Sequence, residues 1–121
     1  MEFTQLMVTK NNQGEVLDFE WGQIVWLVSG AQGSSETMTF GRVTIKAGHA
    51  NPRHIHPNCD EILHLLSGQI EHSLGDEKVV MDAGDTISIP TGIAHNARTI
   101  SSEDAVMVIC FSSPDRKTEA E

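Results

Sequence analysis

Basic residues are scarce in this chain. Lys and Arg number 8 against 17 Asp and Glu, and the formal net charge is −9. Because nucleic acids and anionic membranes are bound through basic patches, this charge balance argues against both as partners. A small-molecule substrate is the expected partner. An anionic substrate would need a local positive site, such as a metal ion together with an arginine.

Cysteine and long apolar runs are also nearly missing. The two cysteines, Cys59 and Cys110, are too few for a disulfide framework. No apolar run approaches the length of a membrane span, and the N-terminal residues do not resemble a signal peptide. These absences make a reducing cytoplasm the expected location.

The sequence has no linker, internal repeat or low-complexity block. Its 121 residues, 39% of them hydrophobic, are enough for one hydrophobic core. We therefore expect a single domain over residues 1–121. Residues 112–121 hold five charged side chains and Pro114, and this polar tail is expected to be disordered.

Short apolar or alternating segments, separated by turn-forming residues, predict strands rather than helices. These segments are residues 24–28, 38–46, 62–66, 69–74, 79–81, 86–89 and 105–111. Two of them, 62–66 and 105–111, are apolar on both faces, which is typical of strands that are covered on both sides. Many short strands with frequent turn signals favour an all-β sandwich or barrel.

Two spaced motifs carry the chemistry. Residues 48–68 follow G-x5-H-x-H-x4-E-x6-G, and residues 84–95 follow G-x5-P-x-G-x2-H. The motifs supply His54, His56, Glu61 and His95. Neutral imidazoles and an ionised carboxylate suit one divalent metal ion, and binding should weaken in acid because protons compete for the same atoms.

Strand geometry is compatible with a shared site. His54 and His56 are two residues apart, so they project to the same side of a strand. Glu61 follows His56 by an odd step and would point away if the strand were straight. The intervening residues 57–60 are rich in turn formers, so a bend there can return Glu61 toward the histidines. His95 must be brought in by the fold.

These residues and spacings resemble the cupin family, whose two short motifs they match as far as the final histidine. The second motif usually ends in Asn four residues later, where this chain has Thr99, so a structural hydrogen bond is in doubt. The resemblance implies a double-stranded β-helix, or jelly-roll barrel, with one metal bound inside by the motif residues. It also suggests a homodimer.

The four candidate ligands leave positions open on an octahedral metal ion, which is what catalysis needs. A closed structural zinc site would more often use cysteine in a tetrahedral shell. Fe or Mn is the first expectation for the metal, and Zn, Ni and Cu remain compatible with this donor set.

His72 is a further candidate for catalysis. It alternates with Ile70 and Leu74 in segment 69–74, which points it inward as a base or a substrate contact. The alternative is a core histidine bonded to a backbone group. His64 has the opposite parity to Glu61 and should face away from the metal. Arg42 and Arg98 lie on predicted strands, where either could bind a carboxylate with two hydrogen bonds, although a solvated strand face is the favoured interpretation. Arg53 precedes His54 and should face away from the pocket.

The resemblance leaves the reaction open, because one fold hosts many chemistries. An enzyme acting on a small oxygenated organic molecule is expected first, and a metal-dependent dioxygenase is the first choice, with Glu61 able to double as a base. An isomerase, lyase or decarboxylase, with His72 moving the proton, is the second choice. The third is a non-catalytic metabolite-binding or sensor protein.

Overall fold

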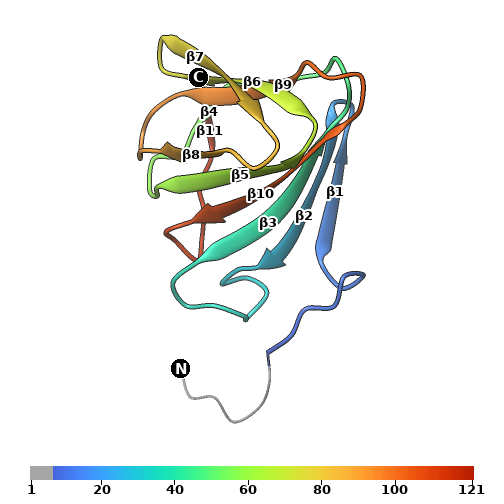
Figure 1. The fold of residues 1–121 in the computed structure, drawn as a ribbon. Coiled ribbons are helices and arrows are strands. Elements are labelled where there is room, and N and C mark those ends of the chain that lie inside the picture. The colour runs from blue at the N-terminus through green and yellow to red at the C-terminus, as the bar shows by residue number, and fades with distance from the viewer. Residues whose placement is uncertain (1–6) are drawn as a thin grey trace.

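The computed structural model describes residues 7–121, which fold into two antiparallel sheets that face each other (Figure 1). The first sheet contains, in order, β1 (Glu15–Phe19), β2 (Gly22–Val28), β3 (Thr39–Ile45), β10 (Ala105–Phe111), β5 (Glu61–Ser67) and β8 (Thr86–Ile89). The second contains β11 (Glu119–Ala120), β4 (His54–Ile55), β9 (His95–Thr99), β6 (Gln69–Leu74) and β7 (Glu77–Asp82). This is the predicted all-β jelly-roll barrel. Within residues 7–121 there is no helix long and apolar enough to span a membrane.

The core lies between the two sheets. Along β3 and β10, buried residues alternate with half-buried ones, as expected when one face of each strand points into the barrel. Aliphatic and aromatic side chains fill this space, among them Val43, Ile45, Leu63, Leu65, Ile70, Met81, Met107, Ile109 and Phe111. Burial of their apolar surface is the main stabilising contribution to the barrel.

Strands β5 and β10 are covered on one face, so the prediction of two covered faces is wrong for the single chain. Ile62 and Leu66 on the outer face of β5 are 51% and 50% exposed. On β10, Val106, Val108 and Cys110 are half-buried. In an antiparallel barrel, alternate side chains point outward, and no second layer formed by residues 7–121 lies over them.

Motif glycines make the turns that bring the site residues together. Gly68 joins β5 to β6 with a φ of 83°, and a Cβ there would lie 2.8 Å from the Cα of Ala105. Both the left-handed backbone and the close approach of β10 therefore require glycine. Thr99 replaces the Asn that usually ends the second motif, and it still makes a structural hydrogen bond. Its Oγ1 donates to the carbonyl of Ile45 at 2.9 Å.

The C-terminal segment, residues 112–121, is ordered against the barrel, contrary to the expected disorder. Glu119 and Ala120 pair with Ile55 and His54 of β4. Upstream, Gly30 N–H donates to the carbonyl of Pro114 at 2.8 Å. Composition alone suggested a frayed tail, but the exposed edge of β4 offers backbone partners that the sequence pattern does not reveal.

Candidate metal centre

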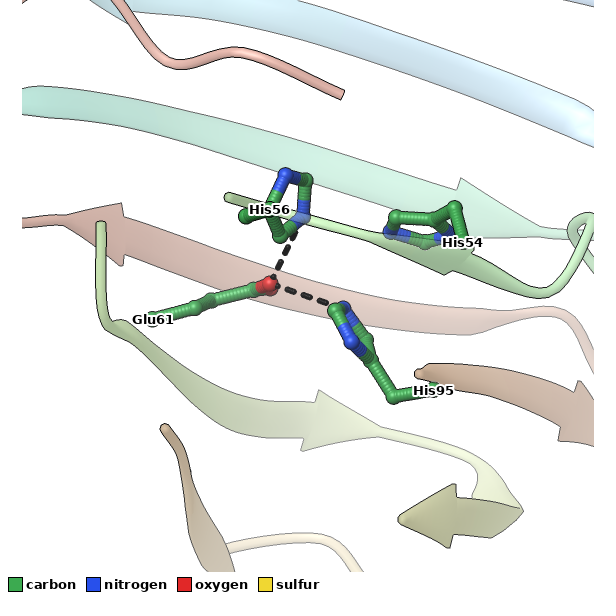
Figure 2. Close-up of side chains that lie close together, drawn as sticks. All are labelled: His54, His56, Glu61 and His95. Atoms are coloured by element: carbon green, nitrogen blue, oxygen red, sulfur yellow. Dashed lines mark hydrogen bonds and ion pairs between the residues drawn. The ribbon is translucent and has the colours of Figure 1, made fainter. Parts of the chain in front are cut away.

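The structure brings together His54, His56, Glu61 and His95, as predicted (Figure 2). One possible ligand atom from each lies within 4.8 Å of the others. His54 and His95 are direct cross-strand neighbours on β4 and β9. The chain then crosses from the second sheet to the first between His56 and Glu61, so the carboxylate faces the histidines from the opposite wall. This crossing is the structural form of the predicted bend.

Backbone carbonyls orient the three imidazoles. Each Nδ1 lies at hydrogen-bonding distance from one carbonyl oxygen: 2.7 Å from Pro52 for His54, 2.9 Å from Lys117 for His56, and 2.9 Å from Ile93 for His95. Because a carbonyl accepts and cannot donate, these contacts assign the proton of each neutral ring to Nδ1. The lone pair is then on Nε2, the atom that faces the cluster in His56 and His95. Such second contacts are typical of metal-binding histidines.

The cluster therefore brings hydrogen-bond acceptors together: the Nε2 atoms of the histidines and the carboxylate of Glu61. Glu61 Oε1 lies 3.2 Å from Nε2 of His56 and 3.1 Å from Nε2 of His95. All three side chains are at most 5% exposed. Acceptors buried this close together need either added protons or a cation between them. One divalent ion satisfies all of them at once, so the residues fit a metal.

The electrostatics of the site favour the deprotonated ligands. Burial would raise the pKa of Glu61, but when no ion is bound and Nε2 of His56 and His95 carries a proton, hydrogen bonds from these rings outweigh burial and lower the pKa to about 2. Burial lowers the pKa of His54 to about 4, against the opposing effect of the Pro52 carbonyl. At neutral pH the carboxylate is thus ionised and His54 is neutral, which are the forms that bind metal.

The four side chains open onto a cavity of about 280 Å³ inside the barrel. Most of its lining surface is apolar and comes from the first sheet, including Leu17, Phe19, Trp21, Ile24, Trp26, Val43, Met107 and Phe111. Phe19 and Trp21 stack with ring centroids 4.8 Å apart. A ligand of the metal would therefore meet polar groups at one end and an apolar wall along its length.

His72 also faces this cavity and is 1% exposed. Its ring stacks on His95 with centroids 5.9 Å apart. Among the residues that the structure describes, none forms a hydrogen bond with its buried Nδ1. Burial, and next the charge of His95, lower the pKa of His72 to about 4, so it is neutral at pH 7. The inward position was predicted. The alternative of a backbone-bonded core histidine has one supporting contact, with the backbone of Ser73, which raises the pKa.

Other candidates lie away from the cavity. His64 points outward as predicted, with Nδ1 2.7 Å from Thr86 Oγ1. Arg53 extends from the other side of β4 and donates to the carbonyl of Gly75 at 2.7 Å. Arg42 and Arg98 make contacts on the outer surface, so no arginine considered from the sequence lines the site.

Arg116 is the cavity residue that sequence reasoning missed. It lies in the segment expected to be disordered, yet its guanidinium carbon is 4.4 Å from the Trp26 ring centroid and 5.4 Å from that of Phe111. Burial lowers its pKa, and the negative charge of Glu61 opposes this. Nothing in a short polar tail signals such a position, because it depends on where β11 docks.

Comparison with known proteins decides the family. A family model described as a cupin domain matches residues 41–111 of the chain. The chain belongs to the cupin family.

Curated relatives of this cupin include plant proteins. "Germin-like protein subfamily 3 member 2" of Arabidopsis thaliana is 32% identical over 76 residues, or 59% of this chain and 34% of that protein. "Oxalate oxidase 1" of Hordeum vulgare is 31% identical over 84 residues, or 63% of this chain and 42% of that protein. The cupin thus spans less than half the length of these relatives.

Solved structures agree on the fold. The cupin matches an oxalate decarboxylase of Lactobacillus farciminis, solved as a formate complex, with a TM-score of 0.83 and 21% identity over 90% of this chain and 34% of that one. It matches a recombinant oxalate oxidase in complex with glycolate with a TM-score of 0.77 and 23% identity, covering 85% of this chain and 56% of that one. At these identities, both similarities show a shared fold.

The first test of the metal centre is metal retention. Protein purified without chelators should bind about one divalent ion per chain, and His54→Ala or His95→Ala should lower the affinity more than about tenfold, because each removes one donor. His64→Ala, on the outer face, is the matched control and should bind as wild type does. Metal analysis and competition with a chromogenic chelator measure both quantities. A His54→Ala/His56→Ala double variant with unchanged affinity would show that the ligand assignment is wrong.

The second test concerns the stability of the chelated protein. Unfolded His72 takes up a proton near pH 6.5, whereas folded His72 stays neutral to about pH 4. The unfolded state therefore binds more protons in this window, and the free energy of unfolding should be highest above pH 6.5 and fall toward pH 4. At pH 5 the loss due to His72 amounts to about 2 kcal/mol.

Urea titrations at pH 7.5 and pH 5 measure this loss. His72→Gln should make it smaller, while the same change at the exposed His49 should leave it as in wild type. Identical pH dependence in wild type and His72→Gln would contradict a neutral buried His72.

Proposed function

We propose that this cupin is a metal-dependent enzyme that oxidises or decarboxylates a small organic acid. The observation that carries the proposal is the convergence of His54, His56, Glu61 and His95 at the polar end of an otherwise apolar cavity. A divalent ion held by these four side chains would have coordination positions left for a substrate oxygen. A purely structural metal would have no need of such a cavity.

We assign Mn or Fe as the metal. Imidazole and carboxylate ligands suit both ions, and one structural neighbour, the oxalate decarboxylase of Bacillus subtilis, is described as having Mn(II) centers. When bound, the ion would polarise a carboxylate or carbonyl oxygen of the substrate and support one-electron chemistry.

His72 is the proposed proton-transfer residue. It is neutral at pH 7, so it can accept a proton from a substrate in the cavity. It also lines a second cavity, together with Leu74, Glu77, Lys78, Val79 and Ile87. His72 therefore borders both the metal site and a separate space nearer the barrel surface, a position from which a proton could be exchanged. Glu61 is proposed mainly as a ligand, because its carboxylate would be occupied by the bound ion.

The choice of reaction follows the chemistry of organic acids. One plant relative, 31% identical, is named an oxalate oxidase, and the structural neighbours include an oxalate decarboxylase and an oxalate oxidase. Dioxygenase chemistry, the first expectation from sequence, consumes O₂ without requiring release of CO₂. Oxidation with decarboxylation consumes O₂ and releases CO₂, and simple decarboxylation releases CO₂ alone. Measuring both O₂ uptake and CO₂ release therefore distinguishes dioxygenation, oxidation with decarboxylation, and simple decarboxylation.

Turnover should be measured on Mn- and Fe-loaded protein with a panel of hydroxy and oxo acids. O₂ uptake and CO₂ release are followed together. We expect CO₂ release from at least one acid, and His72→Gln should reduce the rate at least about tenfold while metal content stays unchanged. His49→Gln, at an exposed position away from the cavity and the outer face of β5, is the matched control. A panel that binds without turnover would instead favour a metabolite-binding or sensor protein.

We further propose that the cupin forms a homodimer through the outer face of β5 and β10. Ile62 and Leu66 are about half exposed there, and Ile62 lies opposite Cys110 in the strand pairing. Val106 and Val108 extend this outer face on β10, and His64 lies between Ile62 and Leu66 opposite Val108, so the surface is largely apolar and partly exposed in a single chain.

Light scattering after gel filtration should give twice the chain mass of 13.2 kDa. Ile62→Glu should shift the protein toward monomer, since a buried unpaired carboxylate opposes association. Val79→Glu, at an equally exposed position on β7, should not. A wild-type monomer at high concentration would exclude this interface.

A further inference from the structure

Arg116 brings a positive charge into a strongly acidic protein at the one place where catalysis is proposed. Among the described residues that line the metal cavity, it is the one with a permanent positive charge. Its guanidinium lies against the rings of Trp26 and Phe111, and the residue is half-buried. A partly desolvated cation interacts with a nearby anion more strongly than a surface cation does.

The segment that carries Arg116 is held on both sides. Asn58 Nδ2 donates to the carbonyl of Asp115 at 2.8 Å, and Lys117 N–H donates to Asn58 Oδ1 at 3.0 Å. The same segment supplies the Lys117 carbonyl that orients His56. Asn58 thus fixes the backbone before and after Arg116, which aims the guanidinium without a large loss of entropy on ligand binding.

The guanidinium of Arg116 has N–H donors that no described residue uses. It has five N–H donors, and within residues 7–121 its one hydrogen bond goes to Thr118 Oγ1. No carboxylate of these residues forms an ion pair with it, although the charge of Glu61 is near enough to influence its pKa. Once Glu61 binds a divalent ion its charge is neutralised, and the site is left with excess positive charge that an anionic ligand would balance.

We propose that Arg116 binds the carboxylate of the substrate, and that the substrate is a carboxylic acid with an apolar body. This rests on the proposed function. A guanidinium matches a carboxylate with two parallel hydrogen bonds. The oxygen next to the carboxylate lies toward the metal ligands, and the body packs against the wall formed by Leu17, Phe19, Trp21 and Ile24.

This assignment separates the cupin from enzymes of oxalate. Oxalate has no apolar part, whereas this cavity has a mainly apolar wall. Oxalate would leave this wall, including the stacked rings of Phe19 and Trp21, without an apolar partner. An acid with an aromatic or branched body satisfies both ends of the cavity.

The test is a binding measurement with mandelate, which has one carboxylate, an adjacent hydroxyl and a phenyl ring. Mandelamide is the neutral comparison ligand, and oxalate is the dianionic one. Calorimetry on Mn-loaded protein without O₂ gives each dissociation constant, and metal content is measured for every variant. Wild type should bind mandelate more tightly than either mandelamide or oxalate.

Arg116→Gln should weaken mandelate binding about tenfold or more, because the charge-assisted pair is lost, and should change mandelamide binding less than about twofold. Arg116→Lys should restore part of the affinity. Lys117→Gln is the control, since it removes an exposed charge from the same segment and keeps the backbone carbonyl that orients His56. Metal content should stay at the wild-type value in all three.

The possible failures are distinct. Wild-type protein that retains no metal would contradict the proposed function rather than the role of Arg116. Equal loss of mandelate and mandelamide binding in Arg116→Gln, or loss of metal in that variant, would make Arg116 a structural residue and overturn the inference. Tighter binding of oxalate than of mandelate by wild type would overturn the assignment of an apolar body.

Discussion

Four acceptor groups in one buried space are the constraint on which the rest of this structure depends. Three carbonyl contacts turn the imidazoles so that their protons point outward, and the Glu61 carboxylate meets two of the rings at 3.1 and 3.2 Å. Without a cation this arrangement is electrostatically unfavourable, so the barrel must stabilise it through its own core. The apolar layers of both sheets provide that stability, and the metal requirement explains why polar groups are buried at this depth.

The C-terminal segment connects the scaffold to the chemistry. The carbonyl of Lys117 orients His56, and the neighbouring Arg116 lines the cavity next to His56. One short segment therefore influences both the geometry of the metal site and the charge that a substrate would meet. It is docked through β11 and Asn58 rather than through a hydrophobic core of its own. Such a segment can change in sequence, and with it the substrate, while the barrel stays the same.

The sequence predicts those features that depend on local spacing. His54 on β4 and His56 just after it share a face because side chains alternate along a strand, and His72 points inward for the same reason. The glycines and the turn-rich residues 57–60 mark the changes of direction correctly. Features that depend on long-range docking were not predictable in this way. Arg116 reaches the cavity because residues far apart in sequence pair at the edge of β4, and the outer face of β5 is left open because no other described part of the chain covers it.

The central claim is that His54, His56, Glu61 and His95 bind one transition metal, with each histidine using Nε2. Anomalous diffraction from a crystal grown without chelators, recorded above and below the absorption edge of the bound metal, tests it most directly. We expect one strong peak at about 2.0–2.3 Å from the three Nε2 atoms and a Glu61 oxygen, with open positions toward the cavity. A peak at other residues, or coordination through Nδ1 of the histidines, would contradict it.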